Sequence, residues 1–166
     1  MVTPVFRYVP GDPALLALMK PFLFLAIAAL SLFNPAAHAE KPINTTLFGV
    51  AIKGFDPVAY FVEGKPRQGD SNFTVEWQGA TWRFANAQHR DAFKATPEQF
   101  APQFGGYCAW AVSQNYTAST DPENAWKIVN GKLYLNYSRE IQKKWELDVP
   151  GNITKAEANW PKLLKK

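Results

Sequence analysis

The strongest constraint on the fold is an alternation of apolar and polar residues on both sides of Gln78-Gly79, in the stretch FTVEWQGATWRF. Successive side chains of a β-strand point to opposite faces, so a turn at this pair places the apolar side chains on one face of a two-stranded ribbon. The stretch therefore predicts an antiparallel hairpin. The expected facing pairs are Phe73 with Phe84, Val75 with Trp82, and Trp77 with Ala80.

A second hairpin is predicted in WKIVNGKLYLNY, which folds back at Asn130-Gly131. Asn-Gly suits a type I′ turn, because both central residues of that turn need positive φ. The two strands again present one apolar face. Ile128 is expected opposite Leu133, and Trp126 opposite Leu135.

Two helices are predicted directly after the first hairpin. NAQHRDAFKA begins with Asn86, whose side chain can cap a helix. TPEQF follows, with Thr96 as the expected N-cap, Pro97 at the first helical position and Gln99 at the capping-box position.

Two further helices are predicted near the carboxyl end. SREIQKKWELDVP carries a Glu140–Lys144 support pair, and Pro150 is expected to end that helix. NITKAEANWPKL is expected to start with Asn152 as its cap. The expected apolar stripes are Ile141, Trp145 and Val149 on the first helix, and Ile153, Ala156 and Trp160 on the second. Together these segments predict an α+β fold, with antiparallel β-hairpins packed against several short helices in a single small domain.

The N-terminal part of the chain is expected to lie outside that domain. Residues 19–39 fit an export signal, with a positive start, a short apolar run and the small-x-small sequence Ala37-His38-Ala39. Residues 1–18 precede a complete signal and are interpreted as an extension from a start codon assigned too early. We expect cleavage after Ala39, a single folded domain at residues 40–166, a periplasmic or secreted location, and no stable membrane span after cleavage.

Charge and composition narrow the function classes. The formal net charge is only +4, and the charges are interspersed, which argues against a nucleic-acid partner. The sequence has one cysteine and two histidines, and His38 falls inside the predicted signal. The remaining pair, Cys108 and His89, is too small for a four-ligand Cys/His site or an internal disulfide.

Cys108 lies in FGGYCAWA, behind two glycines and between aromatic residues. If a helix starts there, its first turn would lower the pKa of the thiol and make it nucleophilic or metal-binding. If the side chain points inward, Cys108 is a small buried hydrophobe. The sequence leaves both alternatives open.

His89 and Asp56 are the other candidate site residues. His89 shares a helical face with Phe93, at the margin of the core, where a histidine is either a hydrogen-bonded packing residue or a ligand. Paired with Cys108, it would give a thiol and its base, or two ligands for a soft metal. Asp56, in GFDPVAYF, is expected to cap a turn and is a further candidate ligand.

Four segments together resemble the YHS-domain family in its longer exported bacterial form, over about residues 47–164. They are GFDPVAYF, WQGATWRFANAQHRDAFKATPEQFAPQFGGYCAWAVS, DPENAWKIVNGKLYLNYS and WELDVPGNITKAEANWPKL. The resemblance implies a small α+β module that is periplasmic or secreted. It also implies a link to heavy metals, because shorter YHS domains accompany copper-transporting ATPases and related metal proteins. Short YHS domains that bind metal rely on paired cysteines. Here Cys108 stands alone, and the helix that carries the short type's cysteine carries His89.

The function predicted on these grounds is a non-enzymatic exported binding module for copper or another soft metal. Its ligands would be Cys108 and His89, with others from Asp56, solvent or a second chain. Such a low-coordination site suits Cu(I) better than structural zinc. The alternatives are a thiol redox protein or enzyme using Cys108 with His89 as base, and a structural or partner-binding domain with Cys108 buried. The protein partner is not predicted.

Overall fold

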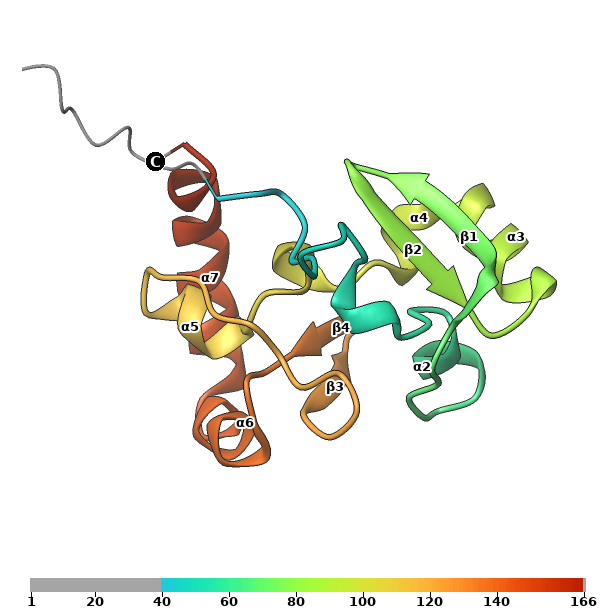
Figure 1. Cartoon of the computed structure of the whole chain (residues 1–166). Helices are drawn as coiled ribbons and strands as arrows, with labels where there is room; N and C mark the ends of the chain where they lie inside the picture. Colours follow the sequence, from blue (N-terminus) through green and yellow to red (C-terminus); the bar gives the residue numbers. More distant parts are fainter. Residues whose placement is uncertain (1–39, 166) are drawn as a thin grey trace, which may run out of the picture. The chain divides into compact units, whose positions relative to one another are not determined.

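The computed structural model describes residues 40–165, so the predicted extension (1–18) and signal (19–39) lie outside the described part. The first hairpin is formed by β1 (Asp70–Trp77) and β2 (Ala80–Phe84) (Figure 1). Two of its three predicted pairs are confirmed, because Val75 faces Trp82 and Trp77 faces Ala80.

The third predicted pair of this hairpin, Phe73 with Phe84, is wrong. Phe84 pairs with Asp70, and the register shifts between Asp70 and Thr74. The Asn72 backbone N–H donates to Asp70 Oδ1 over 2.8 Å. This local Asx turn takes up the additional residues of β1, which strict alternation does not anticipate.

The second hairpin, β3 (Trp126–Val129) and β4 (Lys132–Leu135), has the predicted register. Trp126 faces Leu135 and Ile128 faces Leu133. Both turn residues have positive φ, 51° at Asn130 and 72° at Gly131, as the predicted turn type requires.

Short helices precede and follow the first hairpin along the chain. In chain order they are η1 (Ile52–Gly54), α2 (Ala59–Val62), α3 (Ala87–Ala95), α4 (Pro97–Phe100), η2 (Gln103–Gly106) and α5 (Ala109–Ser113). Asn86 caps α3 as predicted, since its side chain accepts from the His89 N–H. Thr96 occupies the N-cap position of α4, but its hydroxyl contacts Gln99 Oε1 at 3.3 Å rather than a backbone N–H.

The carboxyl-terminal helices are α6 (Arg139–Glu146) and α7 (Val149–Leu163), and the boundary predicted between them is wrong. Asp148 caps α7 by accepting from Gly151 N–H, so Pro150 lies in the first turn of α7 instead of ending α6. Proline is tolerated there because first-turn N–H groups have no helical partner. Val149 thus belongs to α7, and Asn152 is a buried residue inside that helix.

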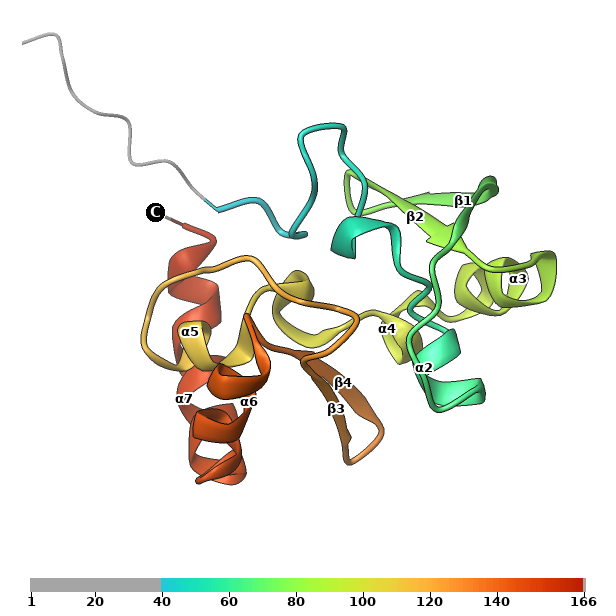
Figure 2. The same ribbon diagram turned by 60° about the horizontal axis from the view of Figure 1, so that its bottom comes forward.

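Apolar packing forms two clusters. The first gathers around the β1–β2 hairpin and α3, and includes the fully buried Trp82, Phe84 and Phe93. The second holds Val112, Trp145 and other residues of α5, α6 and α7. Figures 1 and 2 both show the β3–β4 hairpin between these two groups of elements.

The described residues thus form a small α+β domain with two antiparallel two-stranded sheets and six α-helices. Within residues 40–165, no helix combines the length and the apolar character needed to cross a membrane.

Candidate functional site

Asp56 lies between η1 and α2, and its side chain is completely buried. Its Oδ1 accepts from the backbone N–H of Val58 (2.8 Å) and of Ala59 (3.3 Å), which confirms the predicted turn cap. Its Oδ2 accepts from Ala85 N–H at 2.8 Å and lies 2.6 Å from Nδ1 of His89. Four donors therefore compensate the burial of this carboxylate.

His89 stands in the first turn of α3, where the Asn86 cap fixes its backbone. Its side chain is 12% exposed. The Asp56 carboxylate accepts hydrogen bonds from three backbone N–H groups, so in its contact with His89 we assign the hydrogen to Nδ1 of the imidazole. In the neutral ring this places the lone pair on Nε2, on the side away from Asp56.

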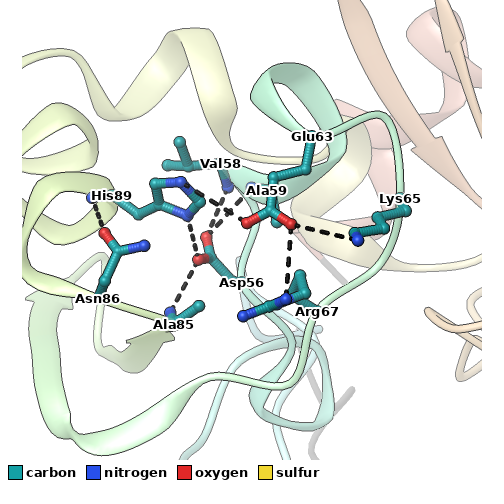
Figure 3. Close-up of polar contacts among 9 residues, drawn as sticks. All are labelled: Asp56, Val58, Ala59, Glu63, Lys65, Arg67, Ala85, Asn86 and His89. Carbon is teal, nitrogen blue, oxygen red and sulfur yellow. Dashed lines mark hydrogen bonds and ion pairs between the residues drawn. The ribbon is translucent and has the colours of Figure 1, made fainter.

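Glu63, the C-cap residue of α2, faces that second ring nitrogen. Its Oε1 lies 3.9 Å from Nε2 of His89, which is too far for a direct hydrogen bond. Its Oε2 lies 3.9 Å from the Lys65 amine and 3.7 Å from the Arg67 guanidinium. In Figure 3, dashed lines join the His89 ring to both carboxylates, one nitrogen to Asp56 and the other to Glu63.

The sequence did not single out Glu63. Helix α2 is only four residues long, so no helical periodicity connects Asp56 before it with Glu63 after it. His89 follows 33 residues after Asp56, beyond the whole first hairpin. Only the packing of α3 against the loop before α2 brings the three residues together.

This arrangement fixes one tautomer and one orientation of an imidazole. A carboxylate that accepts from one ring nitrogen leaves the other nitrogen available as a metal ligand or a base. The second carboxylate, on Glu63, supplies an oxygen donor beside it. The site can therefore bind a cation or accept a proton.

Cys108 combines features of both alternatives that the sequence left open. It is the N-cap residue of α5, yet it is only 1% exposed. Burial raises the pKa of the thiol, although N–H groups of Ala111, Tyr137 and Trp110 act in the opposite direction. The Sγ atom lies 3.7 Å from Asn136 Oδ1. The favourable start of a five-residue helix is thus outweighed by desolvation.

The structure brings Asp56 and His89 together, but gives Cys108 different neighbours. The polar side-chain contacts of His89 go to Asp56 and Glu63, whereas Cys108 contacts Asn136 beside β4. Across residues 40–165, no group of three or more His, Cys, Asp or Glu side chains is arranged to hold a metal ion. Asp56 cannot serve as a metal ligand together with His89 Nε2, because both its carboxylate oxygens already accept hydrogen bonds from other groups.

A small cavity of about 200 Å³ adjoins Cys108. Its other walls include Trp110, Tyr116, Tyr137 and Ile141, so the surface beside the thiol is mainly apolar. This surface favours a role for Cys108 in packing over a role in charge chemistry.

No protein-family model matches this chain, and comparison with curated proteins and with solved structures found no match.

Proposed function

We propose that this domain is a small exported binding module that holds a divalent transition-metal ion through Nε2 of His89 and a carboxylate oxygen of Glu63. The observation that carries the proposal is the 2.6 Å contact between His89 Nδ1 and the buried Asp56 carboxylate. Histidine ligands of metal ions almost always donate their other ring N–H to such an acceptor. Asp56 is then a positioning residue, while His89 and Glu63 are the ligands.

The spacing of the two donors is compatible with one ion. Metal–nitrogen and metal–oxygen bonds of roughly 2.1 Å limit two ligands of one ion to about 4.2 Å apart. The distance from His89 Nε2 to Glu63 Oε1 is 3.9 Å, so a small rotation of either side chain gives bonding geometry. Water or a second molecule would complete the coordination.

This ligand set changes the expected metal. Cys108, predicted as a ligand for Cu(I), is buried beside Asn136, so no thiolate belongs to the set. Imidazole with carboxylate suits Cu(II) or Zn(II) better than Cu(I). Copper remains the first candidate cofactor, in its oxidised state.

Membership in the YHS-domain family and a periplasmic or secreted location are parts of the same proposal. Their support is the order of the four quoted segments and the export-like residues 19–39. The first segment contains Asp56, and the second contains the hairpin and the helix that carries His89. The two residues that contact each other thus come from segments that carry the resemblance.

The test is a Cu(II) titration of the full chain, followed by electron paramagnetic resonance, with Zn(II) as competitor. We expect one site with nitrogen coupling that His89→Ala abolishes and Glu63→Gln weakens. Asp56→Asn, checked for folding by circular dichroism, should weaken binding by roughly 10–100-fold through loss of ring orientation. Cys108→Ser is the matched control and should bind like the wild type.

The variants also separate the alternatives. Residual binding in His89→Ala measures the contribution of His38 and the N-terminal amine. Equal binding by the wild type and His89→Ala would refute the site. Binding lost in both Cys108→Ser and His89→Ala would instead support the Cys/His site expected from the sequence.

A further inference from the structure

A tight hairpin turn displays two large apolar residues, Leu47 and Phe48, to solvent. Leu47 is fully exposed and Phe48 is 91% exposed. Isolated apolar residues on a surface are ordinary, but two adjacent ones at the end of a projecting turn indicate a contact surface. In Figure 2 this turn is part of the blue-green segment that projects beside the β1–β2 hairpin.

The turn is held by backbone hydrogen bonds. Gly49 N–H donates to Thr46 O over 3.0 Å, and Thr46 N–H donates to Val50 O over 2.9 Å. Gly49 has φ of 76°, which a side chain would disfavour. The base of the turn is tied to β2, since Thr81 N–H donates to Gly49 O and Thr81 O accepts from Ala51 N–H, each over 2.9 Å. The backbone that carries the two apolar side chains is therefore held in one conformation.

A hollow of about 480 Å³ lies beside this tip and contains two cationic side chains. Thr46, Leu47, Phe48 and Val50 line it together with Lys53 and Arg83. Among the residues that the structure describes, neither cation pairs with a carboxylate. Arg83 Nε is buried and has no hydrogen-bond partner. Two cationic side chains that line one hollow without a described carboxylate partner suit an anionic ligand.

We infer that this tip, defined by Leu47, Phe48, Lys53 and Arg83, docks on the surface of a bilayer that contains anionic phospholipid. Apolar side chains enter the acyl boundary, while cations next to them meet phosphate groups at the headgroup level. Leu47 and Phe48 at the end of the turn would meet the apolar part of the bilayer, and Lys53 and Arg83 beside them would meet its phosphate groups. A stable protein interface needs about 800 Å² from each partner, which a two-residue tip alone does not offer. This surface is separate from the His89 site and does not depend on the proposed metal function.

The test places a fluorophore at the tip, because the apolar run in residues 21–33 could itself bind lipid. The environment-sensitive dye NBD is attached to Phe48→Cys in the full chain, in a Cys108→Ala background whose folding is checked by thermal melting. Leu147→Cys, at another exposed apolar residue (86%), is the matched control. The probes are vesicles of phosphatidylcholine with phosphatidylglycerol, vesicles of phosphatidylcholine alone, and inorganic phosphate.

We expect a blue shift of the dye at position 48, and none at position 147, on adding the anionic vesicles. Neutral vesicles should give a weaker response. Each cation near an anionic surface contributes about a factor of five to the partition constant. The double variant Lys53→Gln with Arg83→Gln should therefore lower that constant by roughly 30-fold. Leu47→Ser should lower it at least about tenfold.

Four results would overturn the inference. No shift at position 48 excludes insertion of the tip. Equal shifts at both positions indicate non-specific adsorption. A shift with inorganic phosphate but not with vesicles indicates a site for a free anion. A shift that grows with protein concentration without lipid indicates that a second copy covers the tip.

Discussion

At the scale of single residues, burial decides what each candidate group can do. Asp56 is buried as an acceptor of four hydrogen bonds, and its last donor is His89 Nδ1. Cys108 is buried among apolar and aromatic neighbours, where its thiol is harder to ionise. Burial therefore has a different result at each residue. The Asp56 carboxylate, which has four donors, orients a histidine, whereas the Cys108 thiol becomes less reactive.

The thiol alternative can be tested by alkylation of Cys108. Because burial raises its pKa and encloses the sulfur, we expect iodoacetamide to modify the native protein at least roughly 100-fold more slowly than the urea-unfolded chain at pH 8. His89→Ala should leave the native rate unchanged. Mass spectrometry over a time course measures both rates. Rapid native labelling that falls in His89→Ala would support the thiol–base pair instead.

At the scale of elements, the two glycines before Cys108 serve chain packing. Gly105 has φ of 60°, and a Cβ there would lie 1.9 Å from Pro42 O. The N-terminal segment runs across this point, since Asn44 N–H donates to Gly105 O (2.8 Å) and Asn44 Nδ2 donates to Gly106 O (3.0 Å). The glycine pair thus lets two stretches of backbone lie in contact.

Gly105→Ala should therefore be strongly destabilising. The left-handed conformation and the clash with Pro42 together should cost roughly 2–5 kcal/mol of the free energy of unfolding. Gly131→Ala is the matched control, because Gly131 also has positive φ (72°) but nothing lies within 4 Å of its Cβ position. It should cost only about 1–2 kcal/mol. Urea denaturation of both variants gives the comparison, and equal losses would show that contact with Pro42 is unimportant.

At the scale of the whole described domain, Tyr60 connects segments distant in sequence. Its hydroxyl donates to Pro122 O over 2.7 Å, and its ring meets Trp126 of β3 edge to face, with centroids 5.1 Å apart. Tyr60 itself lies in α2, between the Asp56 turn and Glu63. Burial first, and then the charges of Asp56, Asp121 and Glu123, raise the pKa of Tyr60 strongly.

This shift predicts alkaline destabilisation. In the unfolded chain the phenol ionises near pH 10, whereas the folded protein keeps it neutral to higher pH. The stabilisation is therefore complete below about pH 10 and is lost as the pH rises above it. Above about pH 10 the free energy of unfolding should therefore decrease less steeply with pH in Tyr60→Phe than in the wild type, by up to about 1.4 kcal/mol per pH unit.

The measurement is urea denaturation at several pH values from neutral to strongly alkaline. Tyr60→Phe should also lose about 1 kcal/mol at neutral pH, where Pro122 O lacks its donor. Tyr137→Phe, at a residue 59% exposed, is the control and should keep the wild-type slope. An unchanged slope in Tyr60→Phe would show that ionisation of Tyr60 does not govern alkaline unfolding.

The sequence by itself determined the parts of this protein that depend on neighbours close along the chain. The Asn130-Gly131 turn, the pairing of Val75 with Trp82 and the Asn86 cap follow from alternation, turn chemistry and one side-chain hydrogen bond. Two predicted features are wrong, the cap of α7 and one strand pair, and at each of them two local sequence signals compete. Asp148 rather than Asn152 caps α7, and an Asx turn at Asp70 displaces Phe73 from Phe84.

Only the tertiary structure decided which candidate groups meet. Asp56, Glu63 and His89 come from a loop, the end of a four-residue helix and a helix beyond the first hairpin. Cys108 was equally eligible by residue type, but the chain places it against Asn136 and apolar walls. Such partnerships depend on contacts between residues distant in sequence, and local hydrogen bonding and hydrophobic periodicity do not encode them.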